Sequence, residues 1–145
     1  MSQILEPRNV IATGTARTRD DAIREAGALL VTSGAVNDDY VASMFEREAS
    51  VSTYMGNGLA IPHGTNDAKE SILRSALSLV RYEEPIDWNG QPVRFAVAIA
   101  GLNNEHLEIL SKIAIVFSDE DEVQKLIDAG TAEDIFRLLE EVNAE

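Results

Sequence analysis

The chain has 145 residues, which suits one globular domain with a sizeable core and leaves little room for two. It contains no cysteine, so disulfides, thiolate chemistry and cysteine-ligated metal sites are excluded, in agreement with a reducing compartment. The formal net charge of −13 disfavours contact with nucleic acid or with an anionic membrane surface and favours a basic partner; the alternative is that the acidity serves only solubility.

No segment approaches the roughly 20 consecutive apolar residues that a membrane-spanning helix needs. The longest apolar run, from Phe95 to Ala100, has the length of a strand. Residues 1–8 lack the long apolar core of a signal peptide. We therefore expect a cytoplasmic protein.

The first half of the chain contains two predicted helices and two short predicted strands. The first helix begins at Thr18, where Thr18-Arg19-Asp20-Asp21 resembles a capping box, and ends at Ser33-Gly34. The second helix begins near Asn37 and closes at Arg47, with two aspartates in its first turn that favour a helix N-terminus. The strands cover residues 51–55 and 59–61, separated by the turn Gly56-Asn57-Gly58.

The second half contains two predicted strands followed by three helices. The strands cover residues 75–80 and 93–100, with a loop over residues 83–90 between them. Residue types that cap helix N-termini mark the three helix starts, at Asn103 or Asn104, at Ser118 and at Thr131. Gly130 closes the fourth helix, and the fifth extends to Val142. This alternation of helices and strands indicates an α/β or an α+β layer fold.

His63 is the first candidate reactive residue. It follows a short apolar strand and Pro62, whose ring fixes φ, and it precedes Gly64, which leaves room around the backbone. Such a position presents a side chain to a partner and leaves nearby N–H groups free to meet an anion. The alternative is a plain exposed loop histidine.

His106 and Arg47 are candidates for holding an anion beside His63. His106 falls in the first turn of the third helix, after a buried strand, where free N–H groups and the helix dipole bind anions. The guanidinium fork of Arg47 matches phosphate oxygens in geometry and stays charged. The alternatives are a histidine on a helix surface and an arginine paired with a neighbouring glutamate, Glu46 or Glu48.

Other chemistries lack their motifs. The chain has no Gly-rich nucleotide loop, no GxGxxG, no HExxH and no GxSxG elbow. Two histidines without thiols make a poor zinc site, so we expect neither a metal nor a cofactor. Near His63, Thr65 offers a hydroxyl donor and Lys69 a positive charge, although a turn residue and a solvated lysine are the simpler interpretations.

Three motifs taken together resemble those of the IIA domains of the bacterial sugar phosphotransferase system, in the mannitol/fructose superfamily. The central motif is Tyr54-Met55-Gly56-Asn57-Gly58-Leu59-Ala60-Ile61-Pro62-His63-Gly64-Thr65, with Ala68-Lys69 after it. The flanking motifs are residues 40–48 and Asn103-Asn104-Glu105-His106-Leu107. Tyr54, the Gly-Thr pair after the histidine and Asn-Asn-Glu-His are most similar to the mannitol branch.

This resemblance covers nearly the whole chain and implies a fold. Residues 1–145 would form one mannitol-type IIA domain of the α/β class, with a mixed, mostly parallel β-sheet of about five strands flanked by about five helices on both faces. The chain ends at Glu145 without a IIB domain or a membrane transporter domain, so it resembles a free-standing IIA protein.

The resemblance also implies a mechanism. His63 would accept a phosphoryl group on Nε2 from the phosphohistidine of the small carrier protein HPr and pass it to the cysteine of a IIB domain, for uptake of a sugar that in this branch is mannitol. His106 and Arg47 would hold the phosphoryl oxygens. Supporting positions would be Asn57, Gly64 and Thr65; some relatives have an acidic residue at position 57, so no acidic role is carried over to the asparagine.

Two alternatives stay open beside this mechanism. The first is a signalling module of the nitrogen-regulatory type, in which the phosphorylated histidine controls partner proteins and no sugar is moved. The second is an inert structural homologue, against which the presence of both histidines and the arginine argues.

Overall fold

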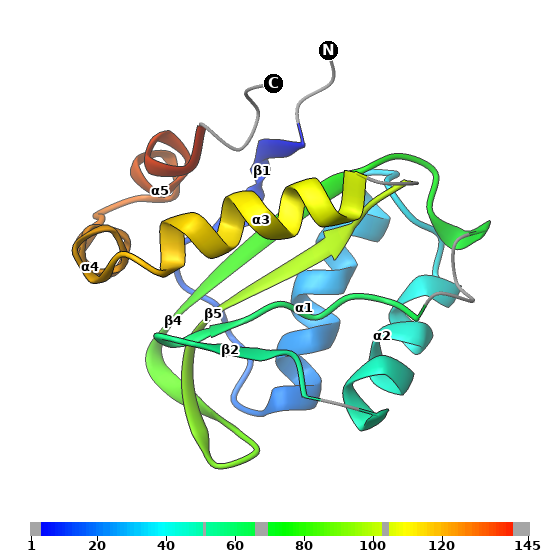
Figure 1. Cartoon of the computed structure of the whole chain (residues 1–145), viewed down its shortest axis with the longest axis horizontal. Coiled ribbons are helices and arrows are strands. Elements are labelled where there is room, and N and C mark those ends of the chain that lie inside the picture. The colour runs from blue at the N-terminus through cyan, green and yellow to red at the C-terminus, as the bar shows by residue number, and fades with distance from the viewer. Residues whose placement is uncertain (1–3, 51, 66–69, 103–104, 141–145) are drawn as a thin grey trace.

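The structure is a computed structural model that describes residues 4–50, 52–65, 70–102 and 105–140. One open sheet is covered by helices on both of its faces (Figure 1). The elements in chain order are β1 (Leu5–Ile11), α1 (Arg19–Thr32), α2 (Asp39–Ser50), β2 (Tyr54–Gly56), β3 (Leu59–Ala60), β4 (Ala76–Trp88), β5 (Gln91–Ala100), α3 (Glu105–Phe117), α4 (Glu120–Asp128) and α5 (Ala132–Leu139).

The sheet is mixed, and its strand order is β1-β4-β5-β3-β2. Two pairings are parallel, β1 with β4 and β3 with β5, whereas β4 with β5 and β2 with β3 are antiparallel. The predicted α/β fold, with a mixed sheet of five strands and five helices on both faces, is confirmed for the described part of the chain. No described helix has the length and apolar character that crossing a membrane requires.

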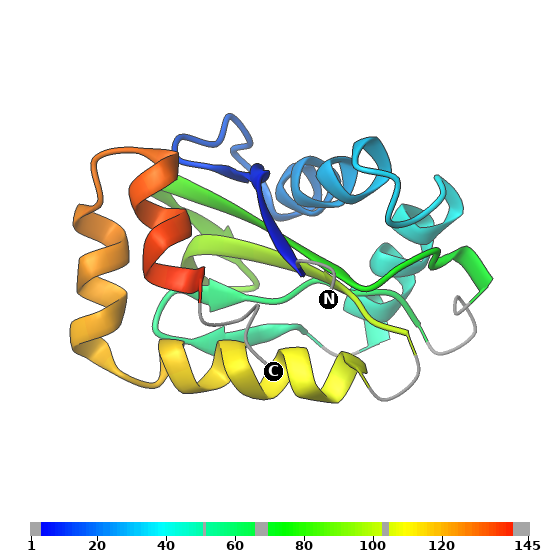
Figure 2. The ribbon, with the colours of Figure 1, turned by 90° about the horizontal axis from the view of Figure 1, so that it is seen from above.

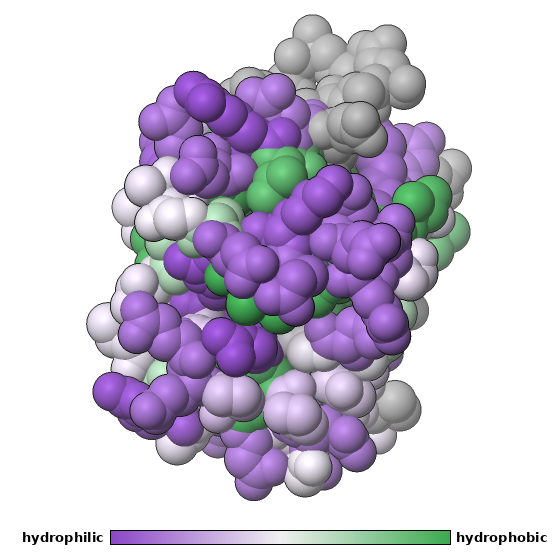
Figure 3. Space-filling view, turned by 90° about the vertical axis from the view of Figure 1, so that its left-hand side faces the viewer, coloured by the Kyte–Doolittle hydropathy of each residue, from purple (hydrophilic) through white to green (hydrophobic). Residues whose placement is uncertain are grey.

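The two faces of the sheet carry different side chains, because successive residues of a strand point to opposite sides. On β5, the larger residues Phe95, Val97 and Ile99 belong to the core beneath α3, α4 and α5. The small residues Ala96, Ala98 and Ala100 belong to the core beneath α1 and α2. Figure 2 shows the two helical layers on opposite sides of the sheet, and Figure 3 shows that the end of the molecule formed by α4 and α5 is mostly hydrophilic.

A buried arginine of β4 attaches α4 to the sheet. The Arg81 guanidinium donates hydrogen bonds to the carbonyl of Ala12, at 2.9 Å, and to three carbonyls at the C-terminal end of α4. A cation at this position satisfies carbonyls that have no partner within the helix and interacts favourably with the helix dipole. The three α4-terminal carbonyls belong to Leu126, Ile127 and Ala129.

The helix caps are confirmed in two cases and wrong in one. Thr18 and Thr131 cap α1 and α5, since each hydroxyl oxygen accepts a hydrogen bond from a backbone N–H three residues later. The cap of α4 is Asp119 and not Ser118, because the aspartate side chain accepts from the N–H of Asp121 at 2.9 Å. The Ser118 hydroxyl instead donates to the Ile115 carbonyl of the preceding helix. The predicted cap at Asn103 or Asn104 and the extension to Val142 lie outside the described residues.

The predicted loop over residues 83–90 is wrong, since β4 continues through it to Trp88 and forms a hairpin with β5. Asn89 and Gly90 make the turn, with φ of 55° and 92°. Two successive residues at positive φ match the twist of a tight β-hairpin, and Asn-Gly is the sequence that prefers it. Pro85 falls within a register irregularity between Arg81 and Ile86, where a missing N–H donor is tolerated.

Three further elements differ from the prediction. β1 was not predicted, α2 extends from Asp39 to Ser50 rather than from near Asn37 to Arg47, and the strand expected over residues 51–55 is β2, from Tyr54 to Gly56. The Asn37 side chain accepts a hydrogen bond from the N–H of Asp39 at 3.1 Å, so it satisfies the N–H group of the first residue of α2.

Candidate active site

β3 ends at Ala60, but the chain continues beside β5, and His63 lies in this continuation. It forms an isolated parallel bridge with Ile99, and the N–H of Ile99 donates to the carbonyl of Pro62 at 3.1 Å. The backbone of His63 is thereby attached to a buried strand, while its side chain is only partly buried. A side chain placed this way has a fixed origin and an accessible end.

The hydrogen bond of the His63 ring determines which nitrogen is reactive. Nδ1 lies 2.8 Å from the carbonyl oxygen of Ile61. A carbonyl only accepts, so Nδ1 carries the hydrogen in the neutral ring and Nε2 carries the lone pair. The geometry therefore makes Nε2 the nucleophilic nitrogen of this imidazole.

The structure brings the other two predicted site residues to His63 from two further elements. The ring of His106, in the first turn of α3, has its centroid 5.0 Å from that of His63, with 52° between the ring planes. Arg47, in the last turn of α2, lines the same cavity as His63, with a volume of about 350 Å³. The cavity is completed by Ser52, Thr53, Met55, Ile61, Leu110, Ser111 and Ala114.

Burial and local charge keep both imidazoles neutral near pH 7. Burial lowers the pKa of His63 below its usual 6.5, and the Arg47 charge adds to this, against the opposing effects of the Ile61 carbonyl and Glu48. The pKa of His106 is also lowered, first by burial and then by the neighbouring His63 and Arg47. A neutral His63 is the form that has a lone pair to donate.

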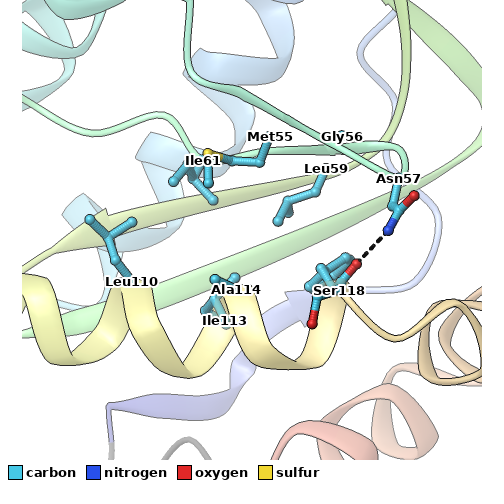
Figure 4. Close-up of a pocket in the computed structure, with 10 residues that line it drawn as sticks. Met55, Gly56, Asn57, Leu59, Ile61, Leu110, Ile113, Ala114 and Ser118 are labelled. Atoms are coloured by element: carbon cyan, nitrogen blue, oxygen red, sulfur yellow. Dashed lines mark hydrogen bonds between the residues drawn. The ribbon is translucent and has the colours of Figure 1, made fainter.

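The supporting positions lie in different places. The backbone N–H of Gly64 donates to the Tyr40 hydroxyl at 2.9 Å, and Thr65 follows it as a partly buried residue. Asn57, at φ 50° in the β2–β3 turn, donates from Nδ2 to the carbonyl of Phe117 at 2.7 Å, which ties the turn to the C-terminal end of α3 (Figure 4). Lys69 lies outside the described residues.

Asn57 lines a second cavity, of about 360 Å³, rather than the one beside His63. The two cavities share four lining residues, so they form one largely apolar groove between the β2–β3 hairpin and α3 (Figure 4). The shared residues are Met55, Ile61, Leu110 and Ala114. The described residues contain no group of three or more His, Cys, Asp or Glu that could hold a metal ion.

Sequence reasoning missed three residues that shape the site. A Cβ on Gly101 would lie 2.5 Å from the Cα of His106, so only glycine lets α3 begin where it does. The buried carboxylate of Glu48 accepts hydrogen bonds from Thr53 and from the Trp88 indole, which holds the end of α2 against the β4–β5 hairpin. Tyr40 contacts the backbone on both sides of the His63 bridge. The contacts of Tyr40 with Ile99 and of Glu48 with Trp88 span 59 and 40 positions, so no local pattern indicates them, although both residues fall within the flanking motif of residues 40–48. Gly101 is close to His106 in sequence, but the close approach depends on the path of the backbone.

Comparison with known proteins identifies the family. Residues 3–142 match the family described as "Phosphoenolpyruvate-dependent sugar phosphotransferase system, EIIA 2". The chain is 49% identical over 144 residues to the mannitol-specific phosphotransferase enzyme IIA component of Halalkalibacterium halodurans, covering 99% of each chain. It is 48% identical over 141 residues to the component of the same name from Geobacillus stearothermophilus, covering 97% of each.

Solved structures agree with this assignment. IIA mannitol from Escherichia coli superposes with a TM-score of 0.85 at 31% identity, over 92% of this chain and 97% of that one. The Escherichia coli complex of enzyme IIA mannitol with phosphorylated enzyme IIB mannitol gives 0.86 at 30%, over 93% and 97%. Nitrogen regulatory protein IIA-Ntr from Neisseria meningitidis gives 0.81 at 29%, over 94% and 96%. The chain therefore belongs to the EIIA 2 family of the phosphoenolpyruvate-dependent sugar phosphotransferase system and is a IIA component of that phosphotransferase.

Proposed function

We propose that this protein carries a phosphoryl group on Nε2 of His63, received from phospho-HPr and passed to the IIB domain of a mannitol-type transporter. The observation that carries the proposal is the 2.8 Å contact between Nδ1 of His63 and the Ile61 carbonyl. It leaves Nε2 as the nitrogen with a free lone pair, in a ring that also shares a cavity with Arg47.

The transfer step needs no proton movement. The Nε2 lone pair forms a bond to the phosphorus while the P–N bond of the donor phosphohistidine breaks, and the electron pair of that bond returns to the donor nitrogen. His63 then holds a phosphoryl group on Nε2 and a hydrogen on Nδ1, so its ring is positively charged. The Ile61 carbonyl, which accepts from Nδ1, stabilises that charge.

His106 and Arg47 act on the phosphoryl oxygens. Phosphoryl transfer depends on positioning and charge stabilisation more than on covalent help from the protein. The Arg47 guanidinium supplies a permanent charge, and His106 supplies an N–H at the N-terminal end of α3, where the helix dipole also favours an anion. The phosphoryl group adds about −1.5 to −2 charges at pH 7, which favours the protonated form of His106 once the group has arrived.

The names of the relatives support mannitol as the transported sugar. Relatives that are 46–49% identical over nearly the whole chain are mannitol-specific IIA components. A IIA domain passes its phosphoryl group to another protein and not to the sugar, so the relatives and not the site carry this part of the proposal. The nitrogen-regulatory alternative has the same fold, as the Neisseria structure shows, and its 29% identity is close to the 30% and 31% of the Escherichia coli mannitol structures. The preference for mannitol therefore depends on the relatives at 46–49% identity.

The test is phosphorylation of the purified protein by phosphoenolpyruvate, enzyme I and HPr, followed by transfer to a panel of IIB domains. We expect acid-labile phosphate on the wild type, none on His63→Ala, and fastest delivery to a mannitol-type IIB domain. Labelled His63→Ala would disprove the assignment of the residue. A labelled wild type that delivers to no IIB domain would favour the signalling alternative.

A further inference from the structure

We propose that Tyr40 is a positioning residue for phosphoryl transfer, whose hydroxyl holds the backbone just after His63 against β5 and so fixes the place of the reactive ring. This role rests on the proposed function of His63. Tyr40 is 2% exposed and lies in the first turn of α2, so its side chain contacts the site from the interior of the protein.

The hydroxyl of Tyr40 occupies a position inside the β-ladder. A parallel pairing of His63 with Ile99 would place two hydrogen bonds, from Ile99 N–H to the Pro62 carbonyl and from Gly64 N–H to the Ile99 carbonyl. The first is present at 3.1 Å. The Tyr40 hydroxyl bridges the two groups of the second: Gly64 N–H donates to it at 2.9 Å, and it donates to the Ile99 carbonyl at 2.6 Å.

The bridging hydroxyl ties the chain immediately after the reactive residue to the end of β5. His63 is then held on one side by the Pro62 carbonyl and on the other by the Gly64 amide, while its ring is tied to the Ile61 carbonyl. Apart from the His63 ring itself, the side-chain group in these contacts is the Tyr40 hydroxyl, so its removal loosens the Gly64 side of His63 and leaves the Pro62 side intact.

The packing around Gly64 leaves no room for a side chain at this position. A Cβ at this position would lie 2.5 Å from the ring atom Cε1 of Tyr40 and 2.5 Å from Oγ of Ser43. The tyrosine ring therefore packs directly against the backbone that its hydroxyl binds. Burial raises the pKa of Tyr40, so the hydroxyl stays protonated and can donate and accept at the same time.

Tyr40 also couples the two halves of the site. It lies seven residues before Arg47 on α2, which places the two side chains on the same side of the helix, two turns apart. Helix α2 carries Arg47, whose positive charge would face the phosphoryl oxygens. The same helix is therefore hydrogen-bonded, through Tyr40, to the backbone next to the nucleophile His63.

The test compares Tyr40→Phe with wild type in single-turnover phosphorylation by phospho-HPr, well below the thermal transition of either protein. We expect the rate at saturating phospho-HPr to fall by about 10- to 100-fold, because a displaced nucleophile loses near-attack geometry. The donor concentration at half-maximal rate stays within about twofold, because Tyr40 is buried and does not meet the partner. The ¹⁵N shifts of the His63 ring should also move away from a single Nδ1–H tautomer.

Tyr82→Phe is the matched control. Tyr82 is also 2% exposed, and its hydroxyl donates to Glu25 at 2.8 Å, with both residues outside the His63 cavity. Its loss should lower stability but leave the rate and the His63 tautomer unchanged. Gly64→Ala is a second variant, which displaces the same backbone while keeping the hydroxyl, and we expect a rate loss similar to that of Tyr40→Phe.

Three results would overturn the role of Tyr40: a wild-type rate in Tyr40→Phe, an equal rate loss in Tyr82→Phe, or, where Tyr40→Phe does not fold, a wild-type rate in Gly64→Ala. In each of these cases wild type still carries phosphate on His63, so the proposed function survives. A wild type without phosphate on His63 would instead remove the proposed function and this role together.

Discussion

His63 and His106 are two imidazoles whose rings lie 5.0 Å apart, yet their surroundings assign them different tasks. The His63 ring is bonded through Nδ1 to a backbone carbonyl, which fixes its tautomer and leaves a lone pair on Nε2. His106 lies at the N-terminal end of α3, where the helix dipole disfavours a cation and favours an anion. One ring is therefore suited to attack and the other to stabilise the arriving charge.

The lowered pKa of His63 predicts how the reaction depends on pH. Burial and Arg47 favour the neutral ring, so the nucleophilic form persists below the usual histidine pKa of 6.5. An NMR titration of the His63 ring should give a midpoint below 6.5, and the transfer rate should hold until the pH falls through that midpoint. A midpoint at or above 6.5 would contradict the burial argument.

The same shift has a consequence for stability. A histidine whose pKa is lower in the folded state than in the unfolded state binds fewer protons when folded. Stability is then lost as the pH falls below 6.5, where the unfolded chain takes up the protons. The lowered pKa of His106 adds to the effect with the same sign.

Removal of either group proposed to hold the phosphoryl oxygens, Arg47 or His106, should slow transfer without unfolding the protein. We expect Arg47→Gln and His106→Gln each to reduce the single-turnover rate by about 10²-fold, because each takes one stabilising group from the transferring phosphoryl group. Arg137→Gln is the control, because Arg137 lies on α5 and pairs with Glu133 on the surface. Rates within twofold of wild type in the first two variants would remove their assigned roles.

At the scale of elements, the site depends on how α3 begins. Gly101 lies very close to the first turn of α3, because a Cβ at this position would be 2.6 Å from the backbone nitrogen of His106. Backbone cannot give way as a flexible side chain can, so the first turn of α3 must move if this glycine is replaced.

Gly101→Ala should therefore destabilise the protein by about 1 to 3 kcal/mol, the usual cost of overpacking. It should also slow transfer, since His106 moves with the turn. Gly130→Ala is the matched control, because its Cβ would make only an ordinary contact, 3.7 Å from an Asp134 oxygen. Urea denaturation and single-turnover transfer measure the two effects, and a Gly101→Ala protein that matches Gly130→Ala in both would contradict the steric argument.

Local signals in the sequence predicted some elements and missed others for identifiable reasons. Thr18 and Thr131 predicted helix starts because a cap acts on residues only three positions away. The β4–β5 hairpin was missed because residues 83–90 were interpreted as a loop, although Asn89-Gly90 is a sequence that favours a tight hairpin turn. β1 was missed because Glu6, Pro7 and Arg8 lie in its interior and its apolar and polar residues do not alternate. It forms because it pairs with β4 at the edge of the sheet, where proline is tolerated.

The residue types of the site were predictable, but their arrangement was not. His63, His106 and Arg47 were candidates because of their chemistry and their place in the resembling motifs, and the structure places them together. The contacts that position them join residues far apart in the chain, such as Tyr40 with Ile99, which are separated by 59 positions. A pattern limited to neighbouring residues does not contain such information.

The whole molecule carries a formal net charge of −13, whereas the site needs positive charge at Arg47. With the proposed function, we expect the global field to attract a basic partner and speed its encounter, and the local cation to offset that field at the proposed phosphoryl site. Distance separates the two effects, since a single nearby charge dominates within the cavity and the sum of all charges dominates outside it.

Salt should therefore slow the encounter with phospho-HPr but not the chemical step. Raising the ionic strength from about 0.05 M to 0.5 M shortens the screening length severalfold, so we expect the second-order rate of phosphorylation to fall by about tenfold. The rate at saturating phospho-HPr should stay within about twofold, because the bound complex excludes most of the salt. A second-order rate that does not change with salt would show that the acidity serves solubility alone.

The most direct measurement is to locate the phosphoryl group by long-range ¹H–¹⁵N NMR on ¹⁵N-labelled protein phosphorylated through enzyme I and HPr. The geometry at Ile61 predicts the group on Nε2 of His63, with Nδ1 still carrying its hydrogen. A phosphoryl group on Nδ1, on His106 or on any other residue would contradict the proposed role of His63 Nε2.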